Sequence, residues 1–157
     1  MTVAYLIRKF PESYMIQKRI LHEINLKFPK FYPKKILDFG AGLSPTGHIY
    51  KQKYPDCEVT AIEPSKSMKD LGKFLSKKIC DIEYYDNLFE GLVNNTDKGF
   101  DIVNCSFVLE EIKTANDKKK IVQNLWEQVN ADGLIIFVLP GTPTGFRYLN
   151  DLRNFFI

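Results

Sequence analysis

The chain has 157 residues, about the length of a single domain. Hydrophobic residues make up 45% and charged residues 26%, a balance that excludes a disordered tail and a collagen-like repeat. The 22 basic and 19 acidic residues leave a net charge of +3, too small an excess to indicate a dedicated nucleic-acid-binding protein. The longest apolar run, residues 133–140, is far shorter than the roughly 20 residues that span a bilayer. We therefore expect neither a membrane nor DNA as a partner.

The predicted elements alternate between short apolar runs and longer amphipathic stretches. In chain order they are a helix over 11–28, a strand over 36–39, a helix over 45–54, a strand over 58–62, a helix from 66, a strand over 82–85, a loop over 86–99, a strand over 100–105, a helix from 115, a strand over 134–139 and a helix from about 145. Pro11 is placed to open the first helix, and Ser65 and Thr114 are placed to cap later ones. Strands that alternate with helices of ten or more residues predict βαβ units and a parallel sheet.

The fold class that follows is α/β, a doubly wound and mostly parallel sheet with helices on both faces, preceded by one helix. We expect a single domain over 1–157, with a helical lead-in over 1–30 and a Rossmann-like core over 35–157. Five strands are predicted, and the sequence stops inside the helix after the fifth. A sheet that ends there keeps an open edge, so we expect C-terminal strands in a longer protein, outside this sequence.

Three side chains carry separate predictions. The helix after Thr114 is predicted to end at Asp132-Gly133. Its apolar positions form one wide face that includes Trp126, so Trp126 is predicted to lie in the core. Cys105 is predicted to be buried in a strand, and His48 to pack or to lie at the surface. The three cysteines, at 57, 80 and 105, form no C-x-x-C pair, so we expect reduced thiols and no metal site within this chain.

A glycine-rich turn follows the first predicted strand, in the sequence Leu-Asp-Phe-Gly-Ala-Gly-Leu-Ser-Pro over residues 37–45. Glycines let such a turn bend tightly and let the backbone approach a ligand. A dinucleotide fingerprint needs a third glycine where Pro45 stands, and this proline also removes an amide donor, which counts against NAD and FAD. No Gly-Lys-Ser/Thr follows, so a phosphate-binding P-loop is excluded.

S-adenosylmethionine, which has no phosphate, fits the turn better. Its sulfonium and amino groups are cationic, and Asp38 at the end of the strand supplies an acid that suits them. Glu63 ends the second strand, 25 positions after Asp38, close to the offset at which a carboxylate accepts both ribose hydroxyls in this kind of fold. The alternative is that Gly40 and Gly42 are packing glycines of a fold that binds no ligand, and that Glu63 is an exposed acid.

These residues resemble the class I methyltransferase fold, the Rossmann-like family that binds S-adenosylmethionine. Its Asp-x-Gly-x-Gly element, its ribose-binding acid, its adenine-side loop and its Phe-Asp-hydrophobic-Val strand match residues 38–42, 63, 86–88 and 100–103. The resemblance implies a cofactor site for S-adenosylmethionine formed by Asp38, Gly40, Ala41, Gly42, Glu63, Pro64, Asp86 and Ser106. No catalytic residue is identified, because methyl transfer depends mainly on aligning donor and acceptor.

A narrower resemblance rests on four stretches, at residues 4–14, 37–42, 106–111 and 140–146. The last of them, Pro-Gly-Thr-Pro-x-Gly-Phe, is the most specific. Together they resemble the methyltransferase-like proteins of the mitochondrial small ribosomal subunit. The resemblance implies ribosome assembly, a role in translation, contact with small-subunit rRNA and a mitochondrial location, although no targeting segment is visible in the sequence. It also implies iron–sulfur cysteines, expected only in parts of the full protein outside this sequence, and a monomer outside the ribosome.

Three functions follow for testing. The first is an S-adenosylmethionine-binding, methyltransferase-like assembly factor that methylates rRNA. The second is a catalytically inactive, ribosome-associated scaffold of the same fold, and the third is a small-molecule methyltransferase. Arg147 and Arg153 in the last predicted helix are candidates for contact with rRNA phosphate, with a solvated helix face as the alternative.

Overall fold

The computed structural model describes residues 2–87 and 99–157 of the chain. Its centre is a sheet of five strands in the order β3-β2-β1-β4-β5, and every pair of neighbours is parallel. The strands are β1 (Lys35–Phe39), β2 (Glu58–Ile62), β3 (Glu83–Tyr85), β4 (Phe100–Ser106) and β5 (Val129–Val138). The predicted fold class, a doubly wound parallel sheet, is confirmed.

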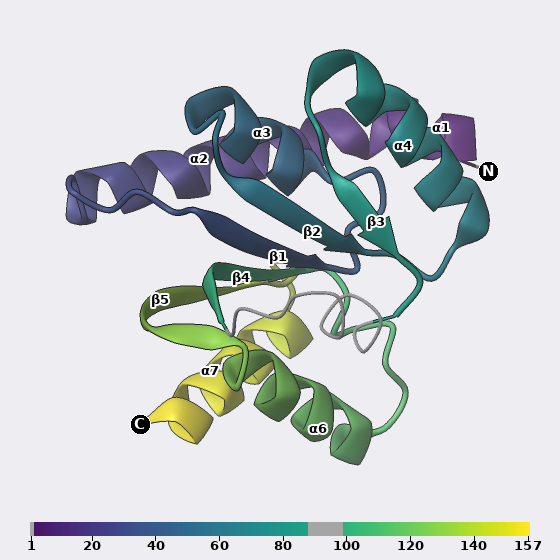
Figure 1. Ribbon diagram of the computed structural model, residues 1–157. Helices are drawn as coiled ribbons and strands as arrows, with labels where there is room; N and C mark the ends of the chain where they lie inside the picture. The colour runs from purple at the N-terminus through teal and green to yellow at the C-terminus, as the bar shows by residue number, and fades with distance from the viewer. Residues whose placement is uncertain (1, 88–98) are drawn as a thin grey trace.

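Helices cover both faces of this sheet (Figure 1). In chain order they are α1 (Thr2–Arg8), α2 (Phe10–Lys27), α3 (Pro45–Lys53), α4 (Lys66–Ile79), α6 (Ala115–Trp126) and α7 (Pro143–Phe156). The first four lie on one face, and α6 and α7 lie on the other (Figure 1). Among the described residues, no helix combines the length and apolarity needed to cross a membrane.

The strand order explains why the helices divide between two faces. From β1 the chain moves outward through β2 to β3, then returns to β4 beside β1 and moves outward again to β5. Because crossovers between parallel strands are right-handed, the two directions place their helices on opposite faces. Neighbouring residues of β1 show the division: Ile36 belongs to the core under α2 and α3, and Leu37 to the core under α6 and α7.

The N-terminal lead-in differs from the prediction. Two helices precede the sheet instead of one, because α1 ends at Arg8 and α2 begins at Phe10, with Pro11 in its first turn. The buried residues of α2 are Gln17, Leu21 and Ile24, whereas Phe28 lies beyond the helix and is exposed. The predicted helix over 11–28 is therefore present, and it starts and ends one residue earlier than predicted.

The boundary between α6 and β5 is the main correction. The helix ends at Trp126, and β5 begins at Val129, so Asp132-Gly133 lies inside the strand and not at a helix end. The register of β4 against β5 shifts between Phe100 and Ile102. A Cβ on Gly133 would lie 2.9 Å from the carbonyl oxygen of Phe100, so this irregular pairing requires glycine.

Trp126 is 48% exposed, and its predicted place in the core is wrong. Because the helix stops at this residue, the indole lies at the end of the α6–α7 layer. There it packs on Phe156, with ring centroids 4.7 Å apart. Thr114 caps α6 as predicted, and its side chain accepts a hydrogen bond from the backbone N–H of Asp117. The predicted loop over 86–99 falls mostly outside the described residues.

Candidate functional site

The candidate site lies where the carboxyl ends of β1, β2 and β4 meet. β1 and β4 are neighbours in the sheet, and the chain leaves them in opposite directions. In open α/β sheets a ligand crevice forms at such a reversal, beyond the carboxyl ends of the strands. The predicted glycine turn follows β1 at this point.

The turn depends on its two glycines. Gly40 has φ +68° and Gly42 has φ +56°, backbone conformations that residues other than glycine rarely adopt. A Cβ on Gly40 would lie 2.1 Å from Cγ2 of Val108, which follows β4. A Cβ on Gly42 would lie 3.4 Å from Met68 and 3.5 Å from the hydroxyl of Tyr5. The turn is thus packed on one side, and α1 and α4 approach it on the other.

Glu63 holds the turn against the end of β2. Its Oε2 accepts a hydrogen bond from the backbone N–H of Gly42 at 2.8 Å, and its Oε1 accepts one from that of Ser65 at 2.7 Å. The residue is 8% exposed, so it is not the exposed acid of the alternative hypothesis. Each carboxylate oxygen has two acceptor positions, so one on each remains for a ligand hydroxyl.

Asp38 lies beneath the turn and is 2% exposed. One carboxylate oxygen accepts a hydrogen bond from the hydroxyl of Ser44 at 2.7 Å, and the other from the side-chain amide of Asn104 at 2.8 Å. Burial raises the pKa of Asp38, and these hydrogen bonds oppose the rise. Among the described residues no Lys, Arg or His forms a salt bridge with Asp38, and the groups that donate to it, the Ser44 hydroxyl and the Asn104 amide, are neutral.

Ser44 joins this acid to the start of α3. It has φ +50°, and its hydroxyl oxygen also accepts a hydrogen bond from the backbone N–H of Gly47 at 3.1 Å. Pro45 then occupies the first turn of the helix, where its missing N–H costs nothing. The unusual backbone of Ser44 is therefore supported by two hydrogen bonds.

The polar network continues to α2 through Gln17, which sequence reasoning missed. Gln17 is 1% exposed, and its amide nitrogen donates to the hydroxyl of Ser106 at 2.8 Å. Ser106 in turn donates to the side-chain oxygen of Asn104 at 3.0 Å. The signal in the sequence is a polar residue four positions before Leu21, on the apolar face of its helix.

Tyr5 is a second residue at this site whose role sequence reasoning missed. It comes from α1, and its hydroxyl approaches Gly42. Burial raises its pKa, and the negative charges of Asp38, Glu63 and Glu111 raise it further, whereas a hydrogen bond with Ser13 lowers it. The phenol of Tyr5 is therefore close enough to the carboxyl edge of the sheet for the charges of these three acids to act on it.

The remaining predicted site residues spread along this edge. Ala41 is buried, and its N–H donates to the carbonyl oxygen of Ile62 at 2.9 Å. Pro64 is exposed directly after Glu63. Asp86 follows β3, and its carboxylate is ion-paired with Lys69 of α4. β3 is bonded to the end of β2 at this point, where the carbonyl oxygen of Tyr85 accepts a hydrogen bond from the N–H of Glu63. The structure therefore places all the predicted positions at one edge of the sheet, with Asp86 at its far end.

The other candidate residues lie outside this carboxyl edge. Cys105 is 1% exposed, as predicted, and burial raises the pKa of its thiol to about 12. His48 packs in the interior. Arg147 and Arg153 are exposed on α7. Within residues 2–87 and 99–157, no group of three or more His, Cys, Asp or Glu side chains is arranged to hold a metal ion.

Comparison with known proteins identifies relatives of the whole chain. A sequence model of the family described as "Mitochondrial small ribosomal subunit Rsm22" matches residues 1–157. The chain is 26% identical over 162 residues to the human mitochondrial ribosome assembly protein METTL17, in a match that covers 98% of this chain and 35% of that protein. The chain thus spans about a third of the length of this relative.

Solved structures share the fold. A putative O-methyltransferase from Nostoc punctiforme superposes with a TM-score of 0.69 at 16% identity, covering 87% of this chain and 40% of that one. The plantazolicin methyltransferase BpumL, solved with S-adenosylhomocysteine, superposes with a TM-score of 0.68 at 15% identity, covering 86% and 50%. The sheet and its helices therefore have the Rossmann-like methyltransferase architecture.

Proposed function

The chain belongs to the Rsm22 family of the mitochondrial small ribosomal subunit, and from this we propose that it binds S-adenosylmethionine and acts in assembly of the small ribosomal subunit. The observation that carries the cofactor proposal is Glu63. Its carboxylate lies at the end of β2, bonded to the glycine turn, with one acceptor position left on each oxygen. The plantazolicin enzyme of the same architecture was crystallised with S-adenosylhomocysteine, which supports this ligand.

The residues present fit the ligand. Glu63 would accept the ribose hydroxyls. Gly42 would let the backbone approach the ligand closely, because among the described residues the atoms nearest to its missing Cβ are side-chain atoms of Met68 and Tyr5, at 3.4 Å or more. Asp38 would act from beneath the turn, where its buried charge favours a cationic group above it. Tyr5 would cover the ligand from α1. When bound, S-adenosylmethionine supplies a methyl group on a sulfonium.

The methyl acceptor we propose is small-subunit rRNA. Support comes from the human relative, a ribosome assembly protein, and from the exposed arginines Arg147 and Arg153 on α7. Arginine is suited to bidentate contact with phosphate. The chain's own contribution to transfer would be alignment of donor and acceptor at the carboxyl ends of β1 and β4, because orientation alone supplies ~7–11 kcal/mol.

Calorimetric titration of the chain with S-adenosylmethionine, S-adenosylhomocysteine and NAD tests the cofactor proposal. We expect the first two to bind and NAD not to bind, because Pro45 removes an amide donor from the helix end that would hold a pyrophosphate. Binding of NAD alone, or of none of the three to folded protein, contradicts the proposal.

A second experiment separates the enzyme from a scaffold of the same fold. Binding of small-subunit rRNA fragments is measured across salt concentrations, together with transfer of labelled methyl groups to the RNA. Salt-dependent affinity with transfer supports the enzyme, and affinity without transfer supports the scaffold. Replacing Arg153 by Ala should reduce the salt dependence, whereas replacing the exposed Lys120 of α6 serves as the control. A chain with no RNA affinity contradicts both proposals and leaves the small-molecule enzyme.

A further inference from the structure

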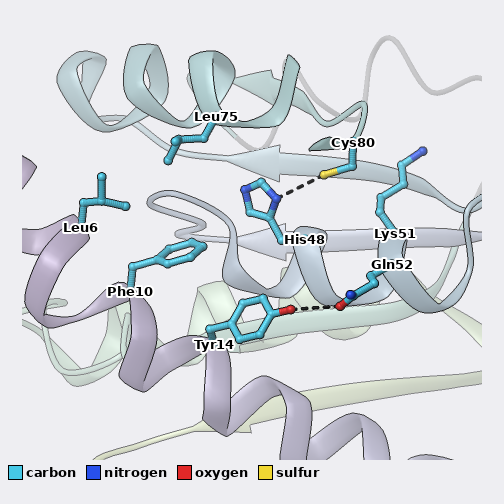
Figure 2. Close-up of a pocket in the computed structure, with 8 residues that line it drawn as sticks. All are labelled: Leu6, Phe10, Tyr14, His48, Lys51, Gln52, Leu75 and Cys80. Carbon is cyan, nitrogen blue, oxygen red and sulfur yellow. Dashed lines mark hydrogen bonds between the residues drawn. The ribbon is translucent and has the colours of Figure 1, made fainter. Parts of the chain in front are cut away.

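A cavity of about 290 Å³ lies on the face of the sheet covered by α1–α4, separate from the carboxyl edge. Leu6 of α1, Phe10 of α2 and Leu75 of α4 give it an apolar lining, and Tyr14 and Gln52 bound one side through a hydrogen bond of 3.0 Å (Figure 2). None of the proposed cofactor-binding residues lines it. Its volume is at the lower end of ordinary small-molecule pockets.

His48 presents an unpaired polar atom to this cavity. The side chain is 95% buried, and its Nδ1 lies 3.2 Å from Sγ of Cys80, which follows α4. Its Nε2 is buried and has no hydrogen-bond partner among the described residues. Figure 2 shows this nitrogen turned away from Cys80, toward the side of the cavity that Leu6 and Leu75 line. Phe10 packs edge-on against the imidazole, with centroids 5.7 Å apart, and so fixes the plane of the ring.

The protonation of the pair follows from its burial. Burial lowers the pKa of His48, so the imidazole is neutral at neutral pH. Burial raises the pKa of the Cys80 thiol, with Lys51 opposing the rise, so the sulfur keeps its proton. We assign the thiol as the donor to Nδ1, because an imidazole nitrogen is a better acceptor than a thiol sulfur. With this assignment the single proton of the neutral imidazole lies on Nε2. One unpaired N–H donor therefore lies buried at the wall of the cavity, on the side that the apolar residues line.

We propose that this cavity is a binding site for a small, neutral aromatic molecule that carries one hydrogen-bond acceptor. The aromatic body would pack between Phe10 and Leu75, and the acceptor would take the proton of His48 Nε2. A buried donor without a hydrogen-bond partner destabilises a folded protein, and few such groups are found. A ligand whose acceptor pairs with this donor would remove the destabilisation, and the recovered free energy would strengthen its binding. A neutral ligand is favoured because most of the lining is apolar and the imidazole is neutral. Lys51 also lines the cavity, but its ammonium group lies on the side of Cys80, away from Leu6 and Leu75 (Figure 2).

Quinoline and naphthalene test the proposal as a matched pair, because they have the same shape and only quinoline has an acceptor. Binding is followed by the NMR signals of the His48 ring and by protection of Cys80 from alkylation, with the buried Cys57 and Cys105 as internal references. We expect quinoline to bind roughly fivefold more tightly than naphthalene, the ratio that one neutral hydrogen bond gives. Occupancy should slow alkylation of Cys80 and leave the other two thiols unchanged.

Two variants complete the test. Replacing His48 by Phe should bring the affinities of quinoline and naphthalene together, because the donor is lost and the ring volume is kept. Replacing Leu75 by Trp should remove binding of both, because the indole fills the cavity. Equal affinity of the two probes for the unaltered chain overturns the proposal. So does binding that survives the Leu75 substitution, or a preference for indole, which offers a donor in place of an acceptor.

Discussion

Replacing Glu63 by Gln probes the ribose assignment, because it removes the charge and keeps the shape. Both carboxylate oxygens accept backbone N–H groups, from Gly42 at 2.8 Å and from Ser65 at 2.7 Å. The amide nitrogen of Gln would meet one of these donors with another donor. Hydrogen bonds to an ionised group contribute about 1.5–3 kcal/mol each, so losing one should lower the free energy of unfolding by about 2 kcal/mol.

Binding of S-adenosylhomocysteine should fall further than stability. Two ribose hydroxyls on a carboxylate make two charge-assisted bonds. Gln loses the bond at its amide nitrogen and keeps only a weaker, neutral one at its oxygen, which together cost about 3 kcal/mol, or roughly 150-fold in Kd. Calorimetry below the unfolding transition of the variant measures this loss. Glu58, exposed at the opposite end of β2, gives the control variant Glu58→Gln, which should bind normally. A Kd within about twofold of the unaltered chain for Glu63→Gln would contradict the assignment.

Three further substitutions test the packing and hydrogen bonds of the fold. Tyr50 is fully buried and its hydroxyl lacks a partner among the described residues, so Tyr50→Phe should raise the free energy of unfolding by about 1 kcal/mol in urea titrations; a loss would reveal a hidden partner. Gly40→Ala places a Cβ 2.1 Å from Val108 at positive φ and should cost about 2 kcal/mol by the same assay, with an unchanged midpoint counting against the turn geometry. Burial raises the pKa of Asp101, but hydrogen bonds from the backbone N–H groups of Lys35 and Lys34, at the start of β1, and from the Asn130 side chain outweigh this effect, so the pKa is lowered. The ionised carboxylate therefore stabilises the fold above the unfolded-state pKa of about 3.9, and this contribution disappears as the pH falls through the lower folded-state pKa. In Asp101→Asn the free energy of unfolding should depend less on pH between about pH 4 and pH 2. An unchanged pH dependence in this variant would show that the pKa of Asp101 is not lowered in the folded state.

Much of this fold could be predicted because its central strands, β1, β2 and β4, are mostly buried. Strands buried on both faces are apolar runs, and the sequence predicts five strands although the edge strands β3 and β5 are less buried. The exception shows the limit of local reasoning. β5 begins at Val129, where the sequence still has helical spacing, because pairing with Phe100 and the close approach at Gly133 hold it in the sheet. Trp126 is exposed for the same reason, since its helix stops there.

The candidate site divides in the same way. Gly40, Gly42 and Glu63 could be named because they follow strands at fixed spacing, and the structure places them together. Gln17 and Tyr5 could not, because they reach the site from helices that lie far away in the sequence. The contact between His48 and Cys80 joins residues 32 positions apart, one on α3 and one directly after α4, and neither residue type predicts such a pair.

Amide NMR spectra of the chain, recorded with and without S-adenosylhomocysteine, locate the ligand directly. If the carboxyl edge of β1 and β2 is the cofactor site, the largest shifts will fall on the N–H groups of Gly40, Gly42 and Ser65. Residues around His48, in the separate cavity, will stay nearly unchanged. Shifts confined to α7 or to the His48 cavity, with the glycine turn unaffected, would contradict the proposed cofactor site.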